Sequence, residues 1–298
     1  DYSKMLQLYR AYKVFLNVNT VIDSPTMFSQ RVYEILACGT PVISSYAKGI
    51  ETQLGENFVY FADTKNEALK HLEYVFKNQF AMYSLGIQRS REILLKHTYT
   101  HRLEVIFEKI GITLKKSLPP VSIITCTNRP NYFQNILHNY KSQNYQNKEL
   151  IVIINTKNKI DLETFKNLLD KNHTDNITHY FQPHTVSLGE CLNFAVSKSS
   201  GDFVAKMDDD DTYFPNYLTD QILALRYANT NIVGKALYYT KVDENIYLRK
   251  IGEENQFVFQ VHGGTLVINK NLAIDIGFAH VSEGEDTSFL LTAQNRGE

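Results

Sequence analysis

The chain has 298 residues, 43% hydrophobic and 21% charged, a composition typical of a soluble globular protein with two domains of ordinary size. Its 31 basic residues nearly balance its 32 acidic ones, which argues against a nucleic-acid partner. No apolar run approaches the ~20 residues that span a bilayer, so we expect no transmembrane segment. Three cysteines without metal-ligand spacing, Cys38, Cys126 and Cys191, predict reduced buried thiols and a cytoplasmic protein, either free or peripheral at the inner face of the membrane. Because the chain begins at Asp1 and stops just after a helix-like segment, we expect it to be a piece of a longer protein.

Residues 1–114 alternate between predicted strands and helices, which indicates a Rossmann-like half. Gly39 ends the second helix by allowing a positive φ. The expected strands are 14–18, 41–44 and 57–61, and the expected helices are 3–11, 28–38 and a helical stretch from 66 to about 110 with breaks near Asn78, Gly86 and Thr98.

The best linker is the basic, proline-stiffened segment 115–120, after which the apolar pattern restarts. A second domain then covers 121–298. Ser187 and Glu190 form a predicted capping box for one of its helices. Its expected strands are 121–126, 150–154, 177–181 and 203–205, its expected helices are 132–142, 162–169, 187–197, 216–228 and 286–295, and the tail 232–268 is expected to be strand-rich and antiparallel or mixed.

The strongest chemical signal is the run Asp208, Asp209, Asp210 and Asp211, which follows the apolar strand 203–205 directly. Carboxylates at the carboxyl end of a buried strand lie where open α/β sheets place their ligands. Four adjacent carboxylates need a cation, and oxygen-only ligands suit Mg²⁺ or Mn²⁺ completed by phosphate oxygens of a nucleotide. The alternative is a solvated acidic turn.

Residues 121–298 resemble a glycosyltransferase family 2 domain of GT-A fold. Four segments carry the resemblance: the opening strand 121–125 with Asn128-Arg129, Ser187-Leu188-Gly189 with Leu192-Asn193, the stretch 201–211 with Pro215 and Leu218, and the late acidic segment 284–287. The order and spacing of the four are more specific than any one of them. The resemblance implies an α/β fold with a mostly parallel central sheet and sugar transfer with inversion.

The same resemblance implies roles for individual residues. Asp208 would lie near the ribose, Asp210 would bind Mn²⁺ or Mg²⁺ with Asp208 beside it, and Asp209 would be a further member of the nucleotide site. Thr125, Arg129, Gly189 and Asn193 would line the nucleotide-sugar pocket. Where the family usually carries an aspartate that touches the base, this chain has Asn155, which can donate as well as accept hydrogen bonds, so the nucleotide remains open, with a UDP-sugar as the first expectation.

The acceptor hydroxyl must lose its proton, and Asp286 is the candidate general base, with Glu285 as its neighbour. The alternative for Asp286 is an acidic N-terminal helix cap. His262, followed by Gly263 and Gly264, precedes a strand and either lines the acceptor site or is structural. The acceptor would be a glycan, a lipid-linked sugar or a protein.

Residues 29–42 resemble the carboxyl-terminal half of GT-B glycosyltransferases of the group 1 and spore-coat-like type. In that family the glutamate matching Glu34 contacts the ribose or sugar of the donor, and the glycine matching Gly39 allows close backbone approach. The alternative is an ordinary helix, glycine cap and strand. A GT-B enzyme needs two facing Rossmann halves, and this chain holds at most one.

The leading hypothesis is an inverting, metal-dependent glycosyltransferase in surface-polysaccharide or glycoconjugate assembly. One alternative is a degenerate nucleotide- or sugar-binding scaffold. The other is a sugar nucleotidyltransferase, which normally has a glycine-rich loop after its first strand. The turn 125–130 lacks glycine, which argues against the latter.

Overall fold

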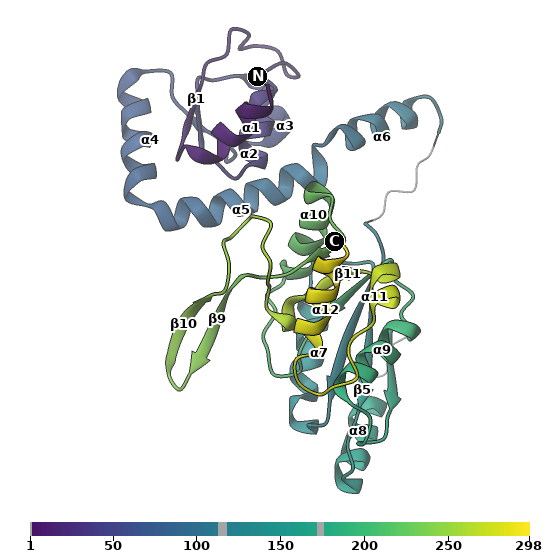
Figure 1. Ribbon diagram of the computed structural model, residues 1–298. Helices are drawn as coiled ribbons and strands as arrows, with labels where there is room; N and C mark the ends of the chain where they lie inside the picture. The colour runs from purple at the N-terminus through teal and green to yellow at the C-terminus, as the bar shows by residue number, and fades with distance from the viewer. Residues whose placement is uncertain (1, 113–117, 172–175) are drawn as a thin grey trace. The chain divides into compact units, whose positions relative to one another are not determined.

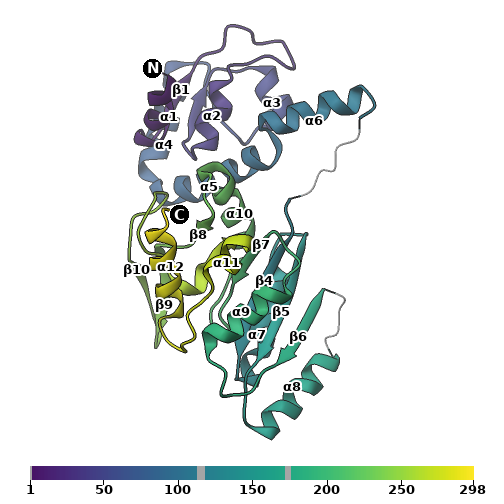
Figure 2. The same ribbon diagram turned by 45° about the vertical axis from the view of Figure 1, so that its right-hand side comes forward.

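The computed structural model describes residues 2–112, 118–171 and 176–298. They belong to two compact units, residues 1–115 and 116–298, each of which is described by itself (Figures 1 and 2). Of the predicted linker, residues 115–117 lie outside the described ranges. In the described part of the chain no helix combines the length and apolar character needed to cross a bilayer.

The first unit is built on a short parallel sheet with the strand order β1-β2-β3. Its core gathers apolar side chains from α2, β2, α3 and α5, among them the fully buried Val32, Val42 and Ile50. The strands are β1 (Phe15–Asn17), β2 (Val42–Ser44) and β3 (Tyr60–Phe61), and the helices are α1 (Tyr2–Ala11), α2 (Arg31–Ala37), α3 (Lys48–Leu54), α4 (Lys65–Lys77), α5 (Gln79–Lys96) and α6 (Tyr99–Lys109).

The expected helix break near Gly86 is wrong, because α5 runs through this residue. A Cβ atom at Gly86 would lie 2.2 Å from the carbonyl oxygen of Gly39, so the glycine allows α5 to approach the end of α2. Gly39 itself has φ +77°, as expected for a helix-ending glycine. The breaks near Asn78 and Thr98 are confirmed, and α3 is a helix that the sequence pattern did not reveal.

The second unit contains a six-stranded sheet with the order β6-β5-β4-β7-β11-β8. Its first four strands are mutually parallel, whereas β11 pairs antiparallel with both β7 and β8. The predicted α/β fold with a mostly parallel central sheet is thus confirmed. The six strands are β4 (Val121–Thr127), β5 (Lys148–Ile154), β6 (Ile177–Phe181), β7 (Phe203–Lys206), β8 (Ile232–Val233) and β11 (Val267–Asn269).

Helices cover both faces of this sheet, which makes three layers (Figure 2). Alternate residues of β4 enter opposite cores: Ile123 packs with α7, α8 and α10, and Ile124 packs with α9, α11 and α12. The helices are α7 (Phe133–Ser142), α8 (Lys159–Lys171), α9 (Leu188–Lys198), α10 (Tyr217–Ala228), α11 (Lys270–Ile276) and α12 (Glu285–Asn295), with short 3₁₀ turns at Pro130–Tyr132 and Gly263–Thr265.

The strand-rich tail is confirmed, because it contains β8, β11 and an antiparallel hairpin of β9 (Leu237–Val242) and β10 (Asn245–Lys250). The short helix α11 was not predicted. The capping box at the start of α9 is present: the Ser187 hydroxyl accepts from the Glu190 amide, and the Glu190 carboxylate accepts from the Ser187 amide.

The strand order reverses beside β4. From β4 the chain moves to β5 and β6 on one side, and it then returns to β7 on the other side. In such sheets, ligands bind outside the carboxyl ends of the strands at the point of reversal. Here those ends are Thr127 of β4 and Lys206 of β7, which leads directly into the acidic run.

Candidate active site

The acidic run forms a tightly held loop after β7. Asn135 donates to the carbonyl oxygens of Asp209 (2.8 Å) and Asp211 (2.7 Å), and Asn139 also donates to that of Asp211 (2.8 Å). The Tyr213 hydroxyl accepts from the Asp208 amide at 2.9 Å and donates to the Gly264 carbonyl oxygen at 2.5 Å. The loop is therefore fixed by side chains and is not a solvated acidic turn.

Asp209 is the buried member of the run, with a side chain only 5% exposed. Its carboxylate accepts a hydrogen bond from the Thr127 hydroxyl at 2.6 Å and forms a two-pronged ion pair with the Arg129 guanidinium. Arg129 also contacts Asp210, with 3.0 Å between Nη2 and Oδ2, and its guanidinium lies over the Tyr132 ring. Arg129 thus ties the turn after β4 to the acidic loop after β7.

Lys206, the last residue of β7, is 4% exposed and lies among three carboxylates. Its Nζ is 3.0 Å from Oδ1 of Asp208, 2.8 Å from Oδ2 of Asp286 and 3.9 Å from Oε1 of Glu285. Burial alone would lower the pKa of Lys206, but Asp208 and Asp286 raise it above its ordinary value. The acidic run and the late acidic segment therefore meet around one ammonium ion.

The segment of His262, Gly263 and Gly264 lies against the same carboxylates. A Cβ atom on Gly263 would be 2.0 Å from Oδ2 of Asp286, and one on Gly264 would be 2.6 Å from Oδ2 of Asp208. Only residues without a side chain allow the backbone to come this close. The His262 ring lies tilted against the Tyr238 ring with 4.2 Å between centroids, and its buried Nδ1 has no hydrogen-bond partner among the described residues.

These groups surround a cavity of about 570 Å³. Its lining includes the ends of β4, β5 and β7 and the start of α12, and comprises Cys126, Thr127, Asn128, Arg129, Asn155, His184, Val186, Leu188, Cys191, Leu192, Lys206, Met207, Asp208, Asp209, Asp210, Ser282, Glu285 and Asp286.

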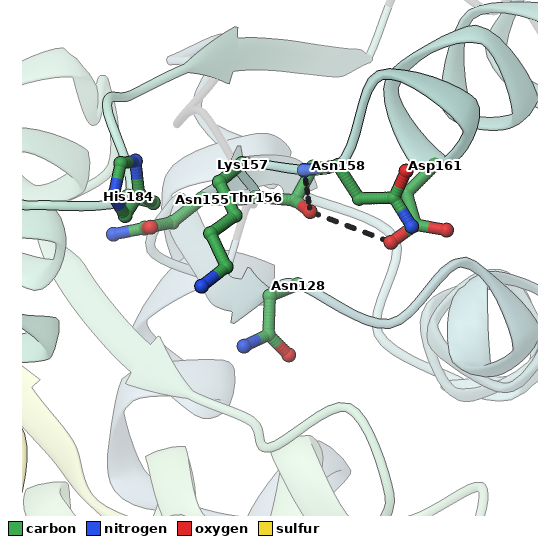
Figure 3. Close-up of a pocket in the computed structure, with 7 residues that line it drawn as sticks. All are labelled: Asn128, Asn155, Thr156, Lys157, Asn158, Asp161 and His184. Carbon is green, nitrogen blue, oxygen red and sulfur yellow. Dashed lines mark hydrogen bonds between the residues drawn. The ribbon is translucent and has the colours of Figure 1, made fainter.

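A shallower cavity of about 400 Å³ shares Asn128, Asn155 and His184 with the first. Figure 3 shows that Thr156 is hydrogen bonded to the Asn158 amide and to Asp161, that Asn155 lies beside His184, and that the Lys157 side chain points toward Asn128. The residues that line it are all polar or charged, which suits a ligand with many hydrogen-bonding groups.

Negative charge dominates the larger cavity. Burial and then the neighbouring Asp286 raise the pKa of Glu285, and burial and then Asp208 raise the pKa of Asp211. Lys206 and Arg129 offset only part of this charge. The site therefore favours a further cation or a ligand that brings one.

The structure brings most of the predicted site residues together. Arg129, Asn155, Asp208, Asp209, Asp210, Glu285 and Asp286 all line the larger cavity. Thr125, Gly189 and Asn193 are not in that lining: Thr125 is buried within β4, Gly189 lies in α9 against the backbone of 279–281, and Asn193 exchanges hydrogen bonds with the backbone of Phe278. Their nucleotide-binding roles remain predictions.

The Asn155 amide is also engaged, since it donates to the carbonyl oxygen of Val186 at 2.7 Å and to Sγ of Cys191 at 3.1 Å. A hydrogen bond from Cys126 and then one from Asn155 lower the pKa of Cys191 to about 7, against the effect of burial. Of the three free cysteines only Cys191 is fully buried, so the expectation of three buried thiols was too simple. Glu34 and Gly39 lie in the first unit, in α2 and just after it.

Sequence reasoning missed Lys206, Asn135 and Asn139. Lys206 carried a signal, because it is the one charged residue of an apolar strand and stands two positions before Asp208. Asn135 and Asn139 are spaced i, i+4 on α7 and so share one helix face, but nothing in the sequence says that this face meets the acidic loop.

Two carboxylates of the acidic loop are accessible to a divalent ion. The carboxylates of Asp208 and Asp210 are 36% and 45% exposed and line the cavity, and an oxygen of Asp211 lies near Gly264 beside that of Asp208. Among the described residues no group of three or more His, Cys, Asp or Glu side chains is arranged as a closed metal site. This incomplete set fits Mg²⁺ or Mn²⁺, which are often bound by one or two carboxylates and completed by phosphate and water.

The sequence was also compared with known proteins. A family model described as "Glycosyl transferase-like" matches residues 1–108, and one described as "Glycosyl transferase family 2" matches residues 122–281. An uncharacterized glycosyltransferase of Rickettsia typhi is 28% identical over 174 residues, 53% of each chain, and one of Rickettsia felis is 27% identical over 174 residues, 53% of this chain and 28% of the relative. The chain thus spans only about a quarter to a half of these relatives.

Among solved structures, S. aureus TarS (residues 1–349) is similar with 18% identity and a TM-score of 0.47, covering 58% of this chain and 55% of that chain. The mannosyltransferase PcManGT from Pyrobaculum calidifontis, in complex with GDP-Man and Mn²⁺, has 15% identity and a TM-score of 0.44, covering 64% and 58%. Both scores are below 0.5, so the assignment rests on the strand order and on the family match, which covers more than half of the chain. The chain belongs to glycosyl transferase family 2.

Proposed function

We propose that residues 121–298 form the catalytic domain of an inverting, metal-dependent glycosyltransferase, separated from a GT-B-like half at 1–114 by the linker 115–120. It would move a sugar from a nucleoside-diphosphate sugar, with a UDP-sugar tested first, to a hydroxyl of a glycan, lipid-linked or protein acceptor. Assembly of a surface polysaccharide or glycoconjugate is the role we favour.

One observation carries the proposal. Asp208 and Asp286, 78 positions apart in the sequence, both contact the ammonium ion of Lys206 inside one cavity that is also lined by Asp210. A transfer site needs a charge-compensating group for the departing diphosphate and a base for the incoming alcohol within one substrate length. The acidic run at 208–211 would hold the charge-compensating group, and the late acidic segment with Asp286 would supply the base.

The roles follow from position. Asp208 and Asp210 would hold a divalent cation, which when bound neutralises the diphosphate leaving group. Arg129 anchors the loop that carries Asp210, and its own guanidinium would lie near the same phosphates. Asp286 would accept the proton of the acceptor hydroxyl as its oxygen attacks the anomeric carbon. A single displacement of this kind inverts the configuration, so no covalent nucleophile is needed.

The shallower polar cavity would take the base or ribose. Asn128 and Lys157 would supply donors there, and Asn155, whose amide hydrogens are engaged by Val186 and Cys191, would supply an acceptor oxygen (Figure 3). Thr125, Gly189 and Asn193 would then act behind the ligand, by holding β4 and α9 in place, rather than by touching it.

The test is a donor screen that measures nucleoside-diphosphate release from UDP- and GDP-sugars, with water as the acceptor of the sugar, in the presence of Mn²⁺ or of EDTA. We expect release from at least one donor with Mn²⁺, and a fall of about 100-fold or more in Asp210→Asn. Asp275→Asn, in which a 70% exposed carboxylate on α11 is altered, should keep the wild-type rate. Metal-independent release, or full activity of Asp210→Asn, would refute the proposed role of the cation.

A non-catalytic binding scaffold is the second candidate. The observation in its favour is that Lys206 already contacts Asp208 and Arg129 already contacts Asp210. Protein side chains thus offset part of the charge of the acidic loop without a metal ion. A scaffold would be stabilised against heat by a nucleoside diphosphate yet release none from any donor, which separates it from the enzyme in the same set of samples.

A further inference from the structure

Lys206 is a buried cation inside a cavity whose other charged groups are mostly acidic. Its aliphatic stem leaves the end of β7, and its Nζ contacts Asp208 and Asp286 at 3.0 and 2.8 Å, with Glu285 at 3.9 Å. The side chain is 5% exposed, so water cannot replace these partners. The contacts join the end of β7 to the first turn of α12. Among the described residues, no backbone hydrogen bond connects these two segments.

The two oxygens of Asp286 are in different situations. Oδ2 accepts the hydrogen bond from Lys206 at 2.8 Å, whereas Oδ1 is buried and has no hydrogen-bond partner among the described residues. An unpartnered buried carboxylate oxygen is costly, so the contact through Oδ2 is what holds this carboxylate beside the cavity that Asp286 lines.

We propose that Lys206 is a positioning residue of the transfer reaction: its ammonium ion fixes the Asp286 carboxylate through Oδ2 and holds it in register with Asp208 beside the cavity. The inference rests on the proposed function. Lys206 donates no proton in the reaction. The proton of the hydroxyl passes to the Asp286 carboxylate as the bond to the anomeric carbon forms and the bond to the diphosphate oxygen breaks.

The same geometry makes the ammonium ion of Lys206 compete with a divalent cation for Asp208. Its ammonium ion already occupies Oδ1 of Asp208, one of the two carboxylates that would hold the metal. Like charges a few ångströms apart repel, so Lys206 weakens metal binding before a nucleotide arrives with its own negative charge. Lys206 therefore has opposite effects on two measurable quantities: it lowers the affinity for the free metal ion and raises the rate of transfer.

The first test needs no substrate. Mn²⁺ binding to the full chain without nucleotide is measured from the loss of the free-ion electron paramagnetic resonance signal. We expect Lys206→Met to bind Mn²⁺ at least about tenfold more tightly than the wild type, and Lys206→Arg to bind like the wild type. Lys241→Met, which removes a 65% exposed lysine on β9, controls for net charge and should leave the affinity unchanged.

The second test uses the donor that gives the highest rate in the screen. We expect Lys206→Met to lower kcat for nucleoside-diphosphate release by about 100-fold with less than a threefold change in the donor KM, and Lys206→Arg to restore most of the rate. If Lys206→Met does not fold, Lys206→Gln takes its place, since it removes the charge but can still hydrogen bond to Asp286.

The outcomes are distinguishable. Equal Mn²⁺ affinity in the wild type and the uncharged variant would overturn the inference even if the wild type is an active transferase, and so would parallel losses of metal affinity and rate. Absence of diphosphate release by the wild type from every donor would overturn the proposed function, while the Mn²⁺ titration would still report on the contact between Lys206 and Asp208.

Discussion

The ion pair between Arg129 and Asp209 allows the sharpest prediction about stability. Asp209 is 5% exposed at its side chain, and its carboxylate accepts from Arg129 and from the Thr127 hydroxyl. Arg129→Met keeps much of the aliphatic stem and its packing on Tyr132 but removes the guanidinium. The variant therefore leaves a buried carboxylate with one of its two protein partners.

Breaking a buried pair costs about 3–5 kcal/mol, because it leaves an uncompensated charge. The Arg129 side chain is 42% exposed, so water reaches that side of the pair and reduces the cost, and we expect a loss of about 2–3 kcal/mol. For a domain of this size that loss corresponds to a fall in Tm of about 4–12 °C. Arg129→Met combined with Asp209→Asn should recover part of it.

Urea unfolding of the full chain, followed by circular dichroism, measures the loss. Arg296→Met is the matched control, since Arg296 is 45% exposed and pairs with an exposed Asp275, and such surface pairs contribute about 0–1 kcal/mol. If both arginine variants lose the same small amount, the buried ion pair does not hold the acidic loop, and the reasoning about Asp209 is refuted.

Three further changes test the packing around the site and in the first unit. Gly189→Ala should destabilise the chain by about 1–3 kcal/mol in urea unfolding, because the new Cβ would lie 1.7 Å from the Ala279 carbonyl oxygen; a stabilised variant would contradict the tight contact. Gly86→Ala should lower the Tm despite the better helix propensity of alanine, since its Cβ would lie 2.2 Å from the Gly39 carbonyl oxygen. Burial raises the pKa of Glu149, but hydrogen bonds from hydroxyl and amide groups together lower it by more. The pKa of Glu149 is therefore below its ordinary value. Its stabilisation is therefore complete above about pH 5 and is lost as the pH falls through the folded pKa, and the stability gap between the wild type and Glu149→Gln should close in acid; a gap that does not depend on pH would count against it.

The order of strands and helices in the second unit could be predicted from sequence because its signals are local. Apolar runs bounded by turn residues give β4, β5 and β7, and Ser187 with Glu190 marks the start of α9. The two acidic segments could be picked out for the same reason. The contact that holds the two acidic segments together could not be predicted, because Lys206 and Asp286 are 80 positions apart and no local pattern indicates that they pair.

The wrong helix break has the same origin. Gly86 was expected to break a helix because glycine has a low helix propensity, but α5 continues through it, and the close contact with Gly39 explains why a glycine stands there. The hydrogen bonds between Asn193 and the backbone of Phe278 are likewise contacts distant in the sequence that no local pattern reveals.

The central claim is that Asp208 and Asp286 serve one reaction at one site. The most direct measurement is the rate of nucleoside-diphosphate release in Asp208→Asn, Asp286→Asn and the double variant. We predict that each single change lowers kcat by about 100-fold or more, and that the double variant is within about threefold of the slower single variant, because residues that act as a unit are not additive. Single variants at the wild-type rate, or a double variant in which the two losses multiply, would contradict the claim.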